Sequence, residues 1–267
     1  MSERPPLRLL HTSDVHLGAY DRVDNERNQK RRAMVEEMFS RVIDVGLRER
    51  VDFMVIAGDF VDNAGVRDDT LRFAAEQVAR LEAPVVLVPG NHDHVGPGSV
   101  YDRTDLTVVA QNLRIMRSPE GETMRLEGLE VEIWGRSHTE LDPDFAPIEG
   151  APMRGDAPWH IGVGHGHYIH DQALMTGNFH IYREHIEPLD HDYVALGHWE
   201  VQARVAGGNV VAAYSGAPEG LAGVKRRRVL VADLERGGSV RLTSHSLADG
   251  PALSHDEIPF LEGVDRS

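Results

Sequence analysis

Short apolar runs and longer amphipathic stretches alternate along the first third of the chain. The runs at residues 7–12, 53–57 and 85–88 have the compact apolar character of buried strands. Residues 28–48 and 68–81 carry apolar side chains at helical spacing: Met34, Met38, Val42 and Val45, then Leu71, Ala75, Val78 and Leu81. The order strand, helix, strand, helix, strand predicts parallel pairing with crossover helices.

The pattern changes after residue 110, where short strand-like segments dominate. They lie at 113–116, 123–126, 131–134, 161–163, 193–196, 201–205, 209–213, 229–232 and 240–244. Gly207-Gly208 and Gly237-Gly238 suit hairpin turns, because glycine adopts positive φ at little cost. We therefore expect an α/β fold with two packed sheets flanked by helices. Residues 248–267 show little periodicity and are expected to form a loosely held tail.

Composition narrows the class of protein. The chain has 267 residues, of which 41% are hydrophobic and 27% charged, a normal globular balance, and its length suits one large domain or a domain plus a small addition. Neither a membrane-spanning run nor a signal-peptide-like run is recognisable, so we expect a cytoplasmic protein. The absence of cysteine excludes disulfides and thiolate metal sites. The formal net charge of -15 argues against indiscriminate binding to nucleic acid, although carboxylates that bind metal would not contribute fully.

Five polar motifs stand close to the ends of apolar runs. They read Asp14-Val15-His16, Gly58-Asp59, Gly90-Asn91-His92-Asp93, Gly164-His165-Gly166-His167 and Gly197-His198-Trp199-Glu200. All of them offer oxygen or imidazole ligands. Hydrolysis by two metal ions needs a bridging ligand, further ligands on each ion and a proton donor for the leaving oxygen. The motifs together supply every part of that set.

In order and residue type, the five motifs resemble those of the calcineurin-like metallophosphoesterase superfamily. Residues 14–18 and 192–198 are most similar to one branch, the SbcD-type DNA repair exonucleases, and Tyr214-Ser215-Gly216 resembles that branch weakly. The resemblance covers residues 7–247, which implies a catalytic domain over 1–247 and a C-terminal tail over 248–267. It also implies a four-layer α-β-β-α sandwich of two mixed sheets with a binuclear metal site at the loop edge.

The resemblance also implies a role for each matching residue. The first metal would be bound by Asp14, His16 and Asp59, and Asp59 would bridge to a second metal completed by Asn91, His165 and His198. A metal-bridging hydroxide would be the nucleophile. His92 would be the general acid or a phosphate-contacting group, and Asp93 would orient it.

One motif departs from the family pattern. Glu200 replaces the last histidine of Gly-His-x-His. Glutamate is a hard oxygen donor, so as a ligand of the first metal it would favour Mn²⁺ over Zn²⁺, with Fe²⁺ and Mg²⁺ as further candidates for the two divalent ions. The other interpretation is that Glu200 points away and leaves the first site weak.

Several other polar residues have more than one interpretation. His167 could replace His165 as a ligand, because the two share a strand face. Asp62 stands where some repair nucleases carry histidine, and a loop or capping carboxylate is the favoured interpretation. Trp199 could stack on a base or serve packing. The basic run 225–228 could follow phosphates, but a solvated turn is favoured.

The sequence thus predicts a metal-dependent phosphodiesterase, most specifically a DNA exonuclease. The alternatives are hydrolysis of a small phosphodiester, such as a cyclic nucleotide, or of a phosphomonoester, and a non-catalytic scaffold with this fold. A phosphodiester substrate, DNA among the candidates, is the expected partner, and no membrane association is expected. A coiled-coil ATPase partner is usual in the SbcD-type branch, and the sequence leaves open whether this protein has one. It also leaves open the oligomeric state.

Overall fold

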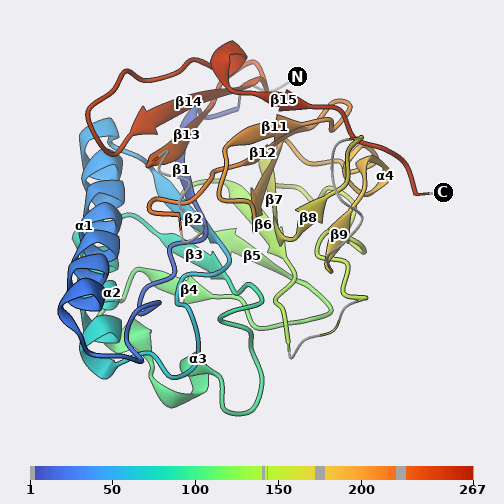
Figure 1. Cartoon of the computed structure of the whole chain (residues 1–267). Helices are drawn as coiled ribbons and strands as arrows, with labels where there is room; N and C mark the ends of the chain where they lie inside the picture. Colours follow the sequence, from blue (N-terminus) through green and yellow to red (C-terminus); the bar gives the residue numbers. More distant parts are fainter. Residues whose placement is uncertain (1–3, 140–141, 143, 172–177, 221–226, 267) are drawn as a thin grey trace.

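Two mixed β-sheets pack face to face at the centre of the molecule (Figure 1). The structure is a computed structural model that describes residues 4–139, 142, 144–171, 178–220 and 227–266. In the described part of the chain, no helix is both long and apolar enough to cross a membrane. The predicted fold class, an α/β sandwich of two mixed sheets with helices, is confirmed.

The first sheet contains the apolar strands of the N-terminal third. Its order is β14-β13-β1-β2-β3-β4, and β1 to β4 are parallel while β13 and β14 run antiparallel. The strands are β1 (Leu7–Thr12), β2 (Phe53–Ala57), β3 (Val85–Val88), β4 (Leu113–Ile115), β13 (Arg228–Leu234) and β14 (Val240–Ser246). The crossover helices α1 (Glu26–Glu49) and α2 (Asp68–Arg80) bury their apolar faces against this sheet. Burial on both faces explains why the parallel strands read as continuous apolar runs.

Polar side chains mark where the two long helices begin. The side chain of Asn25 accepts a hydrogen bond from Asn28 N at 2.9 Å and caps α1. Helix α2 has no cap of its own, and Asp21 supplies one from the loop before α1, accepting from Arg67 N and Thr70 Oγ1, each at 3.2 Å. This contact ties the loop after β1 to the second crossover.

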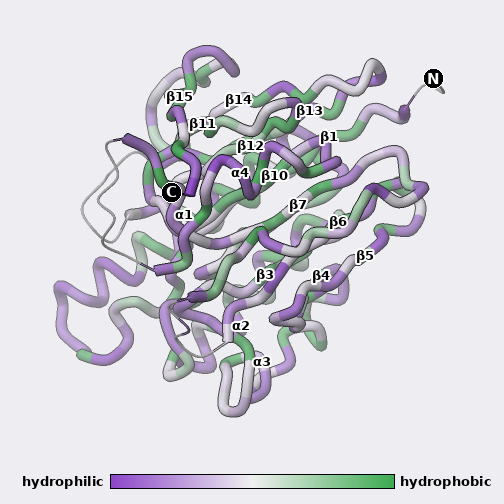
Figure 2. The backbone as a smooth tube through the Cα atoms, turned by 90° about the vertical axis from the view of Figure 1, so that its right-hand side faces the viewer, coloured by the Kyte–Doolittle hydropathy of each residue, from purple (hydrophilic) through white to green (hydrophobic). Residues whose placement is uncertain are grey.

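The second sheet contains most of the short strands that follow. Its order is β15-β11-β12-β10-β7-β6-β5, with β6, β7, β10 and β12 parallel to their neighbours in that series. The strands are β5 (Glu122–Leu126), β6 (Val131–Gly135), β7 (Trp159–His165), β10 (Tyr193–Gly197), β11 (Ala203–Val205), β12 (Val211–Tyr214) and β15 (Phe260–Leu261). Figure 2 shows hydrophobic residues along β7 and β10 and mostly hydrophilic residues in the outer loops.

The main core lies between the sheets, and a thinner layer covers the outside of the second sheet. Phe53 and Val55 from β2 pack with Ile161 and Val163 from β7 in the inter-sheet core. The outer layer contains the short helix α4 (Arg183–Ile186) and the strand pair β8 (His167–Tyr168) and β9 (His180–Ile181). The connection from β3 to β4 holds α3 (Val100–Arg103) and η1 (Leu106–Val108).

The C-terminal segment is attached to the second sheet. It forms η2 (His255–Glu257) and β15, which pairs in parallel with β11. Ile258 is 1% exposed and belongs to the inter-sheet core. The expectation of a loosely held tail over 248–267 is therefore wrong, because a two-residue strand and one buried side chain are too short to show as periodicity. The domain boundary at residue 247 stays a prediction.

Candidate metal centre

The polar motifs meet where strands of both sheets end. In the first sheet they follow β1, β2 and β3, and in the second they follow β7 and β10, whose last residues His165 and Gly197 are register partners. Parallel strands bring their carboxyl ends to one edge, which is where open α/β sheets carry their sites. The chain reversal at each strand end therefore concentrates polar side chains between the two sheets.

The loops after β1 and β2 continue to pair beyond the strands. Asp14 N donates to Gly58 O at 3.1 Å, and His16 N donates to Asp59 O at 3.0 Å. Asp14, His16 and Asp59 have φ values of 52°, 51° and 53°, in the left-handed region that Asp and His enter more readily than most residues. The pairing holds this backbone strain in place.

Asp14, Asp59 and His165 form a fully buried group. One ligand atom from each lies within 4.8 Å of the others. His165 Nδ1 donates to Ala57 O at 2.9 Å, which leaves Nε2 as the ligand atom. That Nε2 lies 3.2 Å from Asp59 Oδ2 and 3.1 Å from Asn91 Oδ1. The structure thus brings four predicted ligands together.

Glycines let the backbone close around His165. A side chain at Gly58 would overlap the His165 imidazole, and one at Gly197 would come within 2.8 Å of its Nδ1. A side chain at Gly90 would overlap the carboxylate of Asp59. The glycine in each of these motifs is therefore needed for close approach as much as for turning the chain.

His16, Asp62 and His92 form a second group next to the first. Their ligand atoms also lie within 4.8 Å of one another. His16 Nε2 lies 3.7 Å from Asp59 Oδ2, and His16 Nδ1 lies 3.4 Å from Asp62 Oδ1. His92 Nδ1 contacts Asp62 O at 2.9 Å, and its side chain is 42% exposed. A loop or capping carboxylate was the favoured interpretation of Asp62 from the sequence, and its spacing after Gly58-Asp59 was the available signal for a place in this group.

Asp93 makes its hydrogen bonds mainly to main-chain amides. Its carboxylate accepts hydrogen bonds from Asp59 N at 3.1 Å, Phe60 N at 2.9 Å, Gly90 N at 2.7 Å and Tyr101 Oη at 2.6 Å. Through these bonds Asp93 fixes the turns after β2 and β3 against each other. Its role in orienting His92 stays a prediction.

The last motif lies on the second-sheet side. His198 N donates to Asp14 Oδ2 at 3.0 Å, and the His198 and His165 ring centroids are 5.2 Å apart. Burial, together with the charge of His165, lowers the pKa of His198 to about 3, which keeps it in the neutral form that binds metals. Glu200 belongs to neither group of ligand atoms in the described residues. Its role as a ligand stays a prediction.

Two serine hydroxyls form a chain of contacts that ends at the carboxylate of Asp14. Ser13 Oγ donates to Asp14 Oδ2, and Ser13 Oγ lies 2.8 Å from Ser215 Oγ. Both serines are fully buried. The segment Tyr214-Ser215-Gly216, whose resemblance to the exonuclease branch was weak, thus reaches the metal centre through hydroxyl contacts. From the sequence, Ser215 was noted only through this weak resemblance, and Ser13 was missed.

The electrostatics of this site fit divalent cations. Asp14, Asp59 and Asp93 are each 2% exposed, and clustered buried carboxylates are costly without a compensating cation. Burial raises the pKa of Asp14 despite the charge of His165. Burial opposes protonation of His165, but Asp59 and Asp14 outweigh it and raise the pKa of this imidazole to about 9. Oxygen and imidazole donors at a negative centre suit hard or borderline divalent metals.

Two other candidates contact each other away from the ligand groups. Trp199 Nε1 donates to His167 Nδ1 at 3.1 Å, and neither residue belongs to the ligand groups of the described chain. The Trp199 ring is stacked on Tyr214, with centroids 5.0 Å apart and planes inclined by 19°. These contacts show a packing role for Trp199.

The basic run at 225–228 lies partly outside the described residues. Of its described members, Arg227 Nε donates to Glu219 Oε2 at 2.6 Å, and Arg228 Nε donates to Ser244 Oγ at 2.6 Å. Both side chains are thus engaged within the fold.

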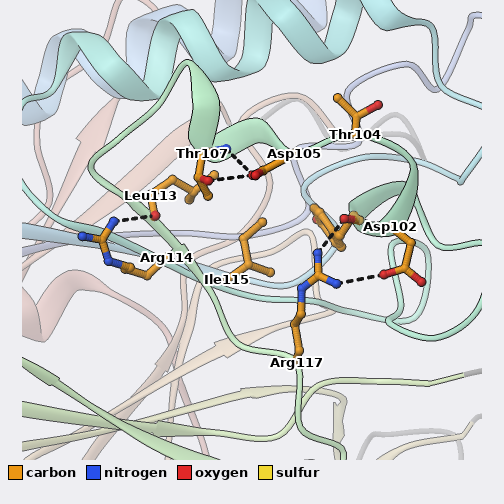
Figure 3. Close-up of a pocket in the computed structure, with 9 residues that line it drawn as sticks. Asp102, Thr104, Asp105, Thr107, Leu113, Arg114, Ile115 and Arg117 are labelled. Carbon is orange, nitrogen blue, oxygen red and sulfur yellow. Dashed lines mark hydrogen bonds and ion pairs between the residues drawn. The ribbon is translucent and has the colours of Figure 1, made fainter.

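A cavity of about 510 Å³ lies apart from the metal ligands, between α3, η1 and β4 (Figure 3). Arg117 donates to Asp102 at 2.8 Å, and Arg114 donates to the carbonyl of Leu113 at 2.9 Å. Tyr101 lines this cavity while its hydroxyl contacts Asp93. Both guanidinium groups thus make hydrogen bonds within the chain.

Comparison with known proteins gives relatives of two kinds. The chain is 30% identical over 88% of its length to the DNA double-strand break repair protein Mre11 of Methanopyrus kandleri, of which the match covers 55%. It is 29% identical over 35% of its length to a Fibrobacter succinogenes protein named "Probable cyclic nucleotide phosphodiesterase", covering 33% of that protein. The chain spans about half the length of the first curated relatives it matches.

A solved structure supports the fold. The crystal structure of a dimetal phosphatase from Danio rerio superposes on 93% of this chain and 99% of its own, with a TM-score of 0.56 at 10% identity. The family model for Calcineurin-like phosphoesterase matches residues 7–202, which include all five motifs. The chain therefore belongs to the calcineurin-like phosphoesterase family, a family of metal-dependent phosphoric ester hydrolases.

Proposed function

We propose that this protein is a binuclear metal-dependent phosphodiesterase that cleaves DNA as an exonuclease. The observation that carries the proposal is the convergence of Asp59 Oδ2 and Asn91 Oδ1 on His165 Nε2, at 3.2 Å and 3.1 Å. A carboxylate, an amide oxygen and an imidazole at one point form a donor set for a divalent cation. The 30% identity to a DNA double-strand break repair protein supports DNA as the substrate.

The protein's own residues would hold two cations, which we expect to be Mn²⁺. Asp14, His16, Asp59 and Glu200 would hold one, and Asp59, Asn91, His165 and His198 the other. Two such cations, when bound, activate a nucleophile and offset the charge that develops on the phosphate. The buried carboxylates set the charge of the site, and the glycine-lined cradle fixes the His165 ring.

His92 would donate the proton to the leaving oxygen. Its Nδ1 faces the Asp62 carbonyl, which can only accept, so this nitrogen carries a hydrogen. Nε2 is then the atom available to the substrate, and it would donate its proton from the imidazolium form, in which both ring nitrogens carry hydrogen. The side chain is 42% exposed at the rim of the site. A proton donor at the rim of a buried ligand group suits a bulky leaving group that stays in solvent.

The test is cleavage of end-labelled single- and double-stranded DNA with Mn²⁺, using His92→Gln as the matched inactive control. We expect products that shorten from an end, and a loss of about 100-fold or more in the variant. No cleavage by the wild type at high enzyme concentration would overturn the DNA assignment.

The second candidate is hydrolysis of a small phosphodiester such as a cyclic nucleotide. It is favoured by the net charge of -15 and by the similarity to a protein named as a cyclic nucleotide phosphodiesterase. Comparing bis-p-nitrophenyl phosphate, p-nitrophenyl phosphate and cyclic nucleotides with Mn²⁺ separates the classes. Turnover of cyclic nucleotides without DNA cleavage would establish this candidate in place of the first.

A further inference from the structure

Asp62 touches both histidines at the rim of the metal centre through different oxygen atoms. We infer that Asp62 is a positioning residue: its side-chain carboxylate orients His16 for metal binding, while its main-chain carbonyl holds His92. The inference rests on the proposed function only in taking His16 as a metal ligand. Its consequence is that Asp62 sets the metal affinity of the first site.

The backbone places Asp62 beside the loop that carries His16. Asp62 N donates to Leu17 O at 3.0 Å, and Leu17 N donates to Phe60 O at 3.1 Å. Leu17 and Val61 form a parallel bridge, and both side chains are fully buried. The position of Asp62 relative to His16 is therefore fixed by main-chain pairing and core packing.

The two carboxylate oxygens of Asp62 have separate partners. Oδ2 accepts from Asn63 Nδ2 at 2.8 Å, and Asn63 Oδ1 in turn accepts from Gly65 N at 2.9 Å. Oδ1 is left facing the imidazoles, 3.4 Å from His16 Nδ1 and 3.8 Å from His92 Nδ1. Asn63 therefore turns the carboxylate so that one oxygen is directed at His16.

The two nitrogens of His16 face two different carboxylates. Nε2 lies 3.7 Å from Asp59 Oδ2, on the side of the predicted metal ligands. Nδ1 is buried and has no hydrogen-bond partner of good geometry among the described residues, so the Asp62 carboxylate at 3.4 Å is its nearest charged acceptor. A carboxylate behind a metal-binding imidazole fixes its tautomer and raises its basicity, and losing that partner typically costs about 10–100-fold in metal affinity.

The hydrogen bond with His92 does not depend on the Asp62 side chain, whose Oδ1 lies farther away, at 3.8 Å from His92 Nδ1. His92 Nδ1 donates to Asp62 O at 2.9 Å, and this carbonyl remains in any substitution at position 62. A change of side chain should therefore act on metal binding through His16 more than on proton donation through His92.

The same three side chains could instead hold a cation of their own, since their ligand atoms lie within 4.8 Å of one another. The hydrogen bond from His92 Nδ1 to a carbonyl removes this nitrogen as a ligand, because a protonated nitrogen has no lone pair for a metal, and leaves only Nε2 of His92 for that role. Metal stoichiometry distinguishes the two roles.

The experiment is calorimetric titration of Mn²⁺ into the metal-free full chain, comparing wild type, Asp62→Ala and Asp62→Asn. Asp156→Ala is the control, since Asp156 is 84% exposed and pairs with Arg125. We expect Asp62→Ala to weaken one site by about 10–100-fold with unchanged stoichiometry, and Asp62→Asn to recover most of the affinity through its amide oxygen. With bis-p-nitrophenyl phosphate, the Mn²⁺ concentration for half-maximal rate should rise by the same factor, and kcat should fall by less.

Three results would overturn the inference. They are wild-type Mn²⁺ affinity in Asp62→Ala, loss of a whole cation from the stoichiometry, or a fall in kcat that exceeds the change in affinity. Melting curves without metal check that each variant is folded, and Asp62→Asn, which keeps the shape of the side chain, decides if Asp62→Ala does not fold. If the wild type binds Mn²⁺ but cleaves no phosphodiester, the proposed function fails while the titration still tests Asp62.

Discussion

The two sheets contribute to the metal centre in different ways. On the first-sheet side, the loops after β1 and β2 pair through their main chains, and Asp93 clamps the turns after β2 and β3 with four hydrogen bonds. On the second-sheet side, His165 is held in a glycine-lined cradle, whereas His198 and Glu200 are only half-buried. The departure from the family pattern, Glu200, thus lies on the half-buried second-sheet side and not among the clamped turns of the first sheet.

The largest effect should come from removing the bridging carboxylate of the first-sheet side. In Asp59→Asn, the two cations would lose their shared ligand, so kcat/KM for bis-p-nitrophenyl phosphate should fall by about 10³-fold. Calorimetry should show loss of at least one Mn²⁺. Asp156→Asn is the surface control, and an Asp59→Asn protein with near-normal turnover would refute the bridging role.

Removal of the Asp93 clamp should mainly affect stability. Asp93→Ala leaves three buried amide donors and the Tyr101 hydroxyl without their acceptor, so the free energy of unfolding should fall by about 3 kcal/mol or more. Tyr101→Phe removes one of these bonds and should cost about 1 kcal/mol. Urea unfolding measures both, and equal losses would show that the main-chain contacts of Asp93 contribute little.

The cradle around His165 can be tested with matched glycines. Gly58 and Gly128 have φ values of 83° and 84°, but a side chain would overlap His165 at Gly58 and meet nothing within 4 Å at Gly128. Gly128→Ala should cost about 1 kcal/mol for backbone strain alone, and Gly58→Ala about 2 kcal/mol more because the imidazole must move. Only Gly58→Ala should weaken Mn²⁺ binding, and similar behaviour of the two variants would argue against the cradle.

The smallest effect is expected at the half-buried second-sheet rim. Glu200→His restores the family pattern and replaces a hard oxygen donor by imidazole, so the ratio of Zn²⁺-supported to Mn²⁺-supported turnover should rise by about tenfold. Glu200→Ala should lower turnover with both metals. If metal content and turnover are unchanged in Glu200→Ala, Glu200 is not a ligand.

The same contrast explains which elements could be predicted from the sequence. The strands at Leu7–Thr12, Phe53–Ala57 and Val85–Val88 were predicted with their observed bounds, because burial on both faces produces an uninterrupted apolar run. The pairs β8–β9 and β11–β15 could not be predicted, since a two-residue strand depends on its partner and has no pattern of its own.

Some features of the site could also be predicted from the sequence, and others could not. The residues that converge were visible as motifs, because ligand chemistry limits each position to a few residue types. The hydrogen-bond partners of Asp93 and Asp62 were not visible in the sequence. They depend on which main-chain groups the paired loops bring close to these carboxylates. The family resemblance implied that Asp93 orients His92, and a loop or capping carboxylate was the favoured interpretation of Asp62.

The contact of His165 with both Ala57 and Asp59 has a consequence for the lifetime of the protein. The imidazole of His165 belongs to the second sheet, whereas Ala57 and Asp59 belong to the first-sheet side. A cation held among these residues would therefore link the two sheets. Ligand bound only by the folded state at 100 times its dissociation constant adds about 2.7 kcal/mol to stability. Without the metal, the protein would unfold more often and would therefore be degraded more often. A cell that lacks the metal would then contain less of this protein, and the protein that remains would be less active.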